Sequence, residues 1–143
     1  MRAIKLTVLL GAIVALSASC GMLGAKKVFA SEDDLRREYK ESSDKFKAKY
    51  DGKEVSAWGR AGIMSITDSG GIVYFESNTD SSVSGAPSIS CYVDSPDSAR
   101  FQELKVEAGT LIRVKGKMKL EGGAMRLESC KLEKVGSSAL SDE

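Results

Sequence analysis

The chain has 143 residues, with 21 Lys and Arg against 20 Asp and Glu, 42% hydrophobic residues, three Cys and no His. This length allows one compact domain with a leader or a tail, because a single core usually organises roughly 100 to 150 residues. The absence of His excludes Ser-His-Asp and Cys-His catalytic sites and every zinc site that needs imidazole. The net charge of +1 argues against a polycationic nucleic-acid coat, which usually gathers a basic excess on one face.

Residues 1–19 have the composition of a secretory signal peptide. Two basic residues near the start precede the apolar run Leu6–Ala18, which ends in the small residues Ser17-Ala18-Ser19. This order of basic, apolar and small residues is typical of an export signal. An uncleaved signal anchor is the alternative, because residues 6–25 carry no charge and about 20 apolar residues can span a bilayer.

The end of this leader also predicts a lipid attachment site. The segment Leu16-Ser17-Ala18-Ser19-Cys20 resembles a bacterial lipobox, with Ser17 where that motif favours Leu. In such a motif the cysteine is lipidated and becomes the mature N-terminus, whereas ordinary cleavage after Ser19 would release the chain. We expect lipidation at Cys20, a tether over residues 20–30, and a domain anchored to a membrane of the cell envelope or released into the periplasm or medium.

The other two cysteines, Cys91 and Cys130, are candidates for a disulfide. An oxidising compartment permits such a bond, and the chain has no Cys-x-x-Cys spacing that would indicate a redox motif or a zinc ribbon. Two buried free thiols are the alternative.

One helix is predicted at the start of the domain, over residues 31–51. Ser31 and Asp34 approximate a capping box, and Leu35, Tyr39, Phe46 and Tyr50 recur at helical spacings. Gly52 is a natural stop.

From Lys53 onward the period changes from helical to alternating, which predicts a barrel over residues 52–135. The five expected strands cover residues 53–66, 71–77, 88–94, 110–120 and 124–135. A short helix opens at Ser95-Pro96 and runs to about Lys105, and residues 136–143 are expected to be a polar tail.

The fourth strand alternates most clearly. Apolar side chains at 112, 114, 118 and 120 share one face, and the basic side chains of Arg113, Lys115, Lys117 and Lys119 share the other. In the last strand the apolar positions shift by one, which implies a bulge near Glu128 or Ser129. Cys91 and Cys130 then point into the same interior.

The predicted order of three strands, a short helix and two strands, with bends at Gly59 and Gly116, is that of a five-stranded OB-fold barrel. Several segments of the sequence also resemble the bacterial tRNA_anti-like family of OB-fold proteins, many of which are predicted lipoproteins. The similar stretches, within residues 33–135, are KYDGKEV at 49–55, SCY at 90–92, GTLIRVKGK at 109–117 and LESCKL at 127–132, together with Tyr39 and Gly59. The resemblance implies a mainly β OB-fold domain and assigns no activity.

For function we expect an exported, membrane-tethered, non-catalytic module that binds a protein, peptide or glycan of the cell envelope. The alternative is an OB-fold protein that binds single-stranded or transfer RNA-type nucleic acid, for which the acidic loops and near-neutral charge are unfavourable. A free secreted effector and an enzyme are lesser alternatives, because no carboxylate pair has a spacing that places it reliably in one cleft and the sequence contains no metal ligand set or cofactor motif. The candidate ligand face is Trp58, Tyr74, Tyr92, Arg113, Lys115 and Lys117. For Trp58 a packing contact is the competing interpretation, and for the basic stripe a solvated strand face that pairs with Glu128 and Glu133.

Overall fold

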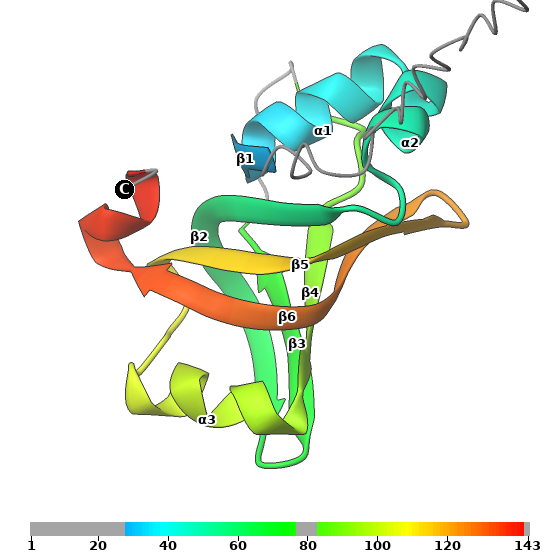
Figure 1. The fold of residues 1–143 in the computed structure, drawn as a ribbon. Helices are drawn as coiled ribbons and strands as arrows, with labels where there is room; N and C mark the ends of the chain where they lie inside the picture. The colour runs from blue at the N-terminus through cyan, green and yellow to red at the C-terminus, as the bar shows by residue number, and fades with distance from the viewer. Residues whose placement is uncertain (1–27, 77–82, 142–143) are drawn as a thin grey trace, which may run out of the picture.

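The structure is a computed structural model that describes residues 28–76 and 83–141 (Figure 1). In chain order its elements are β1 (Val28–Ser31), α1 (Glu32–Glu41), α2 (Ser43–Tyr50), β2 (Glu54–Thr67), β3 (Gly70–Phe75), β4 (Ile89–Asp94), α3 (Ser95–Glu103), β5 (Leu111–Glu121), β6 (Ala124–Val135) and the 3-10 helix η1 (Gly136–Leu140). The predicted signal peptide and Cys20 lie outside the described residues. Within them, no helix is long and apolar enough to cross a bilayer.

Five strands close into a mixed barrel in the order β2, β3, β4, β6, β5 and back to β2. Closure depends on the length of β2, which pairs with β5 through residues 54–60 and with β3 through residues 61–67. All neighbours are antiparallel except β4 and β6, and α3 connects β4 to β5 below the barrel in Figure 1. This is the predicted OB-fold-like barrel, and all five expected strands and the short helix are present.

The core is formed by the alternating inward positions of the five strands. Ile112, Val114 and Met118 of β5 are fully buried, as their alternation predicts. Cys91 and Cys130 form a disulfide with their Cα atoms 5.7 Å apart. The backbone at Gly116 passes so close to this bridge that a Cβ atom there would lie 2.8 Å from the Glu128 carbonyl oxygen and 3.2 Å from Cys130 Sγ. Glycine is therefore required at this point of β5.

The predicted bulge in β6 is also present. The register between β5 and β6 shifts between Lys115 and Lys117, and Ser129 adopts a positive φ of 50°. This bulge lets Met125 and Leu127 on one side of it, and Cys130 on the other, all face the interior.

The single helix expected over residues 31–51 is two helices, which corrects the prediction. Ser42 ends α1 and begins α2, because its own N–H bonds the carbonyl of Glu38 while its hydroxyl accepts from the N–H of Lys45. A serine that satisfies the backbone on both sides competes with a continuous helix. The two helices lie over the upper end of the barrel in Figure 1 and bury Leu35, Phe46 and Tyr50 against it.

Two further elements were not predicted. Residues 28–30, expected within the tether, belong to strand β1, which pairs in parallel with β2 at the part of β2 that β3 does not reach. Val28 and Ala30 pack against the core. Residues 136–140, expected within the polar tail, form η1 with Ala139 fully buried.

Candidate functional site

The basic stripe of β5 is not a uniform cationic surface, because Arg113 is buried. Its Nε lies 3.1 Å from the Glu133 carboxylate and its guanidinium lies 5.1 Å from the centre of the Phe29 ring. It also donates to the carbonyl oxygen of Ser141. Arg113 therefore joins β1, β5, β6 and the segment after η1, and the expectation that it faces solvent was wrong.

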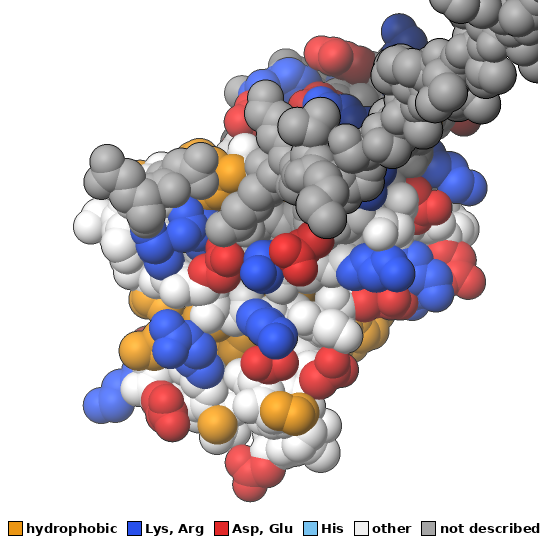
Figure 2. All heavy atoms as spheres, viewed as in Figure 1, with side chains coloured by type: hydrophobic (Ala, Val, Ile, Leu, Met, Phe, Trp, Pro, Cys, Tyr) orange, Lys and Arg blue, Asp and Glu red, His pale blue; other side chains and the backbone are white. Residues whose placement is uncertain are grey.

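The remaining cations of the stripe are largely neutralised by neighbouring acids. Lys115 lies 3.4 Å from Glu54, and Lys119 lies 3.6 Å from Glu121 and 3.5 Å from Glu128. The predicted pairing of the stripe with Glu128 and Glu133 is confirmed. Lys117 is exposed and forms no ion pair with a described residue. Figure 2 shows side chains of both signs interspersed over this face.

Trp58 is half-buried on the outside of the barrel, directly across the β2–β5 ladder from Arg113. It is not a member of the buried core cluster. The six predicted ligand-face residues thus divide into two groups. Trp58, Arg113, Lys115 and Lys117 lie on the outer side of β2 and β5, whereas Tyr74 and Tyr92 lie on the outer side of β3 and β4.

The outer side of β3 and β4 presents apolar and aromatic side chains. Ile72 and Tyr92 are directly opposite each other in the ladder, and Tyr74 is two residues along β3. Val73 and Phe75, which alternate with Ile72 and Tyr74 along β3, are buried in the core. Tyr74 is 42% exposed, so this side chain is accessible to a ligand.

A bulge in β2 adds Ile63 to this surface. The β2–β3 register shifts between Ala61 and Met64, so that Gly62 and Ile63 both stand opposite Tyr74. Ile63 is 79% exposed, an unusual position for so large an apolar side chain. Alternation alone could not predict this bulge, although Gly62 within a strand is the sequence signal for one. We call Ile63, Ile72, Tyr74 and Tyr92 the β3–β4 face.

Arg126 of β6 borders the β3–β4 face. It lies beside Ser90 in the parallel β4–β6 ladder, and its guanidinium is 5.5 Å from the centre of the Tyr92 ring. Arg126 also donates to the Glu121 carboxylate at the β5–β6 hairpin. The cation is therefore paired, and it holds the Tyr92 ring in place from one side.

Carboxylates stand at both ends of the β3–β4 face. Asp94 is opposite Gly70 where β4 ends, Asp68 is in the β2–β3 hairpin beside it, and Glu76 follows β3 at the other end. All three are exposed, and none forms an ion pair with a described residue. Asp94 occupies the N-cap of α3 without using its side chain as a cap.

A buried ion pair attaches the chain before β4 to α1. Arg36 donates to the carbonyl oxygens of Val83 and Ala86, and its Nε lies 3.5 Å from the Glu32 carboxylate. Glu32 also accepts from the backbone N–H of Ile89, the first residue of β4. Burial raises the pKa of Glu32 to about 7, against the opposing effect of Arg36. This pair positions the end of β4 that enters the β3–β4 face.

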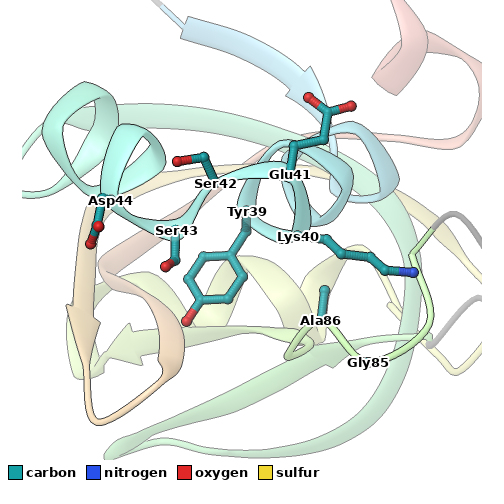
Figure 3. Close-up of a pocket in the computed structure, with 8 residues that line it drawn as sticks. All are labelled: Tyr39, Lys40, Glu41, Ser42, Ser43, Asp44, Gly85 and Ala86. Carbon is teal, nitrogen blue, oxygen red and sulfur yellow. The ribbon is translucent and has the colours of Figure 1, made fainter.

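A surface depression lies at the junction of α1 and α2. It has a volume of about 450 Å³ between that junction and the chain at Gly85 and Ala86, and Figure 3 shows the Lys40 side chain extending toward the segment that holds Gly85. A smaller one of about 170 Å³ continues from Tyr39 to the β5–β6 hairpin. Both are open and polar, with hydroxyls and charges of both signs, so their chemistry selects no ligand class.

No group of three metal-ligating side chains occurs in residues 28–76 and 83–141. No protein-family model matches the sequence, and a search of curated proteins found no match.

Proposed function

We propose that the protein is an exported, membrane-tethered, non-catalytic binding module of the tRNA_anti-like type. It binds a protein, peptide or glycan partner in the cell envelope through its β3–β4 face. The observation that carries this proposal is the exposure of a large apolar and an aromatic side chain on adjacent barrel strands, Ile63 of β2 and Tyr74 of β3.

Exposed apolar side chains gathered on one surface are typical of interaction sites, because single-chain proteins otherwise keep such patches small. The β3–β4 face combines the aliphatic side chains of two isoleucines with the aromatic rings and hydroxyl groups of two tyrosines. Aromatic residues supply much of the binding energy at protein interfaces, and Tyr contributes both ring area and a hydroxyl.

The leader and the disulfide support the envelope location. The order of residues in 1–20 is that of an export signal ending at a lipidation site. A disulfide between Cys91 and Cys130 suits an oxidising compartment. Lipidation at Cys20 would leave few residues between the membrane and β1, and would keep the barrel close to the bilayer.

The location is tested by the intact mass of the full-length protein extracted from bacterial membranes. We expect a mass that begins at Cys20 with acyl chains attached and that rises by the mass of about two protons on reduction. An unprocessed, reduced protein recovered without membranes would contradict the envelope proposal.

The binding face is tested by site-specific photo-crosslinking in cells that express the full chain. A photoreactive residue replaces Tyr74 in one variant and Leu104, the residue that follows α3, in the matched control. The Leu104 side chain is exposed to nearly the same extent, 43% against 42%. We expect adducts with an envelope partner at position 74 and not at position 104. Identical adducts at both positions, or none at 74, would contradict the proposal.

Nucleic-acid binding is the second candidate, because Tyr74 and Tyr92 lie on the strand pair where OB folds stack bases. The carboxylates at both ends of that face oppose a polyphosphate backbone. A titration with the oligonucleotide dT20 distinguishes nucleic-acid binding from the proposed binding of an envelope partner. We expect no binding at physiological salt, whereas salt-dependent binding that is lost in Tyr74→Ala would favour nucleic acid.

A further inference from the structure

From the charge around the β3–β4 face, we infer that its partner is a cationic polypeptide segment, in which apolar side chains are flanked by Lys or Arg. This inference rests on the proposed function and names the chemistry of the partner. It begins from the arrangement of the face, where an apolar centre lies between carboxylates at both ends.

The apolar centre is extended along the strands. Ile72 and Tyr92 form one row across β3 and β4, and Ile63 and Tyr74 form the next. Two rows of this kind, with side chains of large area and no described element over them, can receive two or three apolar side chains of an extended segment.

Three exposed carboxylates stand at the ends of the face. Asp68 and Asp94 stand at the hairpin end and Glu76 at the other, and none of these carboxylates is in an ion pair with a described residue. The helical cap does not use the side chain of Asp94. These acids are therefore available to a partner.

Two of the three cations nearest the face are in ion pairs. Arg126 is bound to Glu121, and Lys119 lies between Glu121 and Glu128. At the Glu76 end, the carbonyl of Arg60 accepts from the N–H of Glu76, while the Arg60 guanidinium donates to the carbonyl of Gly109 on the edge of β2 that leads to β5. A partner with acidic groups would meet uncompensated carboxylates, whereas Lys or Arg side chains beside its apolar residues would pair with them.

Selection of peptides from a phage library of random 12-residue sequences tests the inference directly. The bait is the full-length protein in detergent, and the readout is the mean net charge of the enriched peptides against the unselected library. We expect a positive shift, with apolar residues among the cations. Binding of an enriched peptide should weaken several-fold between about 50 and about 500 mM salt, because exposed charge pairs are screened.

A charge variant and a matched control locate the effect. In Glu76→Lys/Asp94→Asn the affinity of an enriched cationic peptide should fall about tenfold, which corresponds to about 1.4 kcal/mol. The control Glu103→Lys/Asp44→Asn makes the same change of net charge on the exposed surfaces of α3 and α2 and should leave affinity within about twofold.

The outcomes separate this inference from the proposed function. Enriched peptides that depend on Tyr74 but show no excess of Lys or Arg would overturn the cationic partner and leave the binding face intact. A fall in affinity that is equal in the two charge variants would also overturn it. Failure to enrich any peptide above the detergent blank, together with no crosslink at position 74, would overturn both.

Discussion

The Arg36 guanidinium and the Glu32 carboxylate pair at 3.5 Å with both side chains almost completely buried. Both residues belong to α1, yet the groups that complete their environment come from the chain at Val83, Ala86 and Ile89. The pair therefore joins the N-terminal helix to the start of β4. Since β4 carries Tyr92, the geometry of the β3–β4 face depends on a contact far from it in the sequence.

Removal of the Arg36 side chain should destabilise the protein strongly. In Arg36→Ala the buried Glu32 loses its cation and two backbone carbonyls lose a donor, which costs about 3 to 5 kcal/mol for a buried pair. The control is Arg37→Ala, which breaks an exposed pair with Asp34 and should cost about 1 kcal/mol or less. Urea unfolding measures both, and equal losses would contradict the structural role of Arg36.

Glu32 should make stability depend on pH between about 4.5 and 7. Burial raises its pKa from 4.5 to about 7, so the folded protein holds a proton there that the unfolded chain releases. The contribution of Glu32 is thus complete below pH 4.5, and it is lost as the pH rises to 7. The unfolding free energy of wild type relative to Glu32→Gln should fall over this range by at most about 3 kcal/mol. Parallel pH profiles of the two proteins would refute this.

Arg113 and Lys117 should respond differently to alanine, although the sequence places them on one stripe. Arg113→Ala removes a buried cation that pairs with Glu133 and contacts Phe29, and a loss of about 2 to 4 kcal/mol is expected. Lys117→Ala changes an exposed side chain and should alter stability by about 0.5 kcal/mol or less. Thermal unfolding of the two variants side by side is the measurement. A negligible effect of Arg113→Ala on stability would contradict the structural role of Arg113 and favour the interpretation of the stripe as a solvated strand face.

The Cys91–Cys130 bridge should contribute to stability by restricting the unfolded chain. The two cysteines are separated by 39 residues, for which loop closure predicts about 3 to 4 kcal/mol. The midpoint of urea unfolding should therefore decrease on addition of a reductant. The double variant Cys91→Ala/Cys130→Ala serves as the control, because a reductant should not change its midpoint.

Replacement of Gly116 by Ala should disturb the barrel near the same bridge. The added Cβ would lie 2.8 Å from the Glu128 carbonyl oxygen, and overpacking of this kind costs about 1 to 3 kcal/mol. Gly122→Ala, in the β5–β6 hairpin, is a useful comparison. Its Cβ would meet nothing within 4 Å, although its φ of 59° disfavours Ala. If crowding is the cause, the NMR chemical shifts of residues around the Cys91–Cys130 disulfide should change in Gly116→Ala and not in Gly122→Ala.

The barrel itself was predictable because its signals are local. Alternation in β5, the Gly-rich hairpins and the Ser-Pro helix start each lie within a few residues, and the shifted apolar positions in β6 revealed the bulge at Ser129. Burial of one face makes the register of such strands unambiguous. The inward direction of both cysteines followed from the same patterns.

Other features depend on contacts between segments that are distant in the sequence. The pairing of β1 with β2 and the packing of η1 each require a partner element elsewhere in the chain, and the periodicity of the sequence does not identify that partner. Arg113 is an example of a residue whose face, but not its burial, can be predicted from the alternation of the strand. Alternation assigned it correctly to the outer face, and its pairing with Glu133 followed from the sequence. However, β1 and the segment after η1 cover that face, and only the tertiary structure brought Phe29 and Ser141 to Arg113.

The sequence by itself determined which residues alternate, where the chain turns and which cysteines face inward, because these properties depend on neighbours a few residues away. The tertiary structure decided which parts of the outer surface stay uncovered. No described element covers the β3–β4 face, and the carboxylates at its ends form no ion pair with a described residue. The elements that cover the barrel elsewhere lie against other strands, because β1 pairs with β2 and η1 contacts β5 and β6. That choice depends on long-range packing, which no local pattern contains.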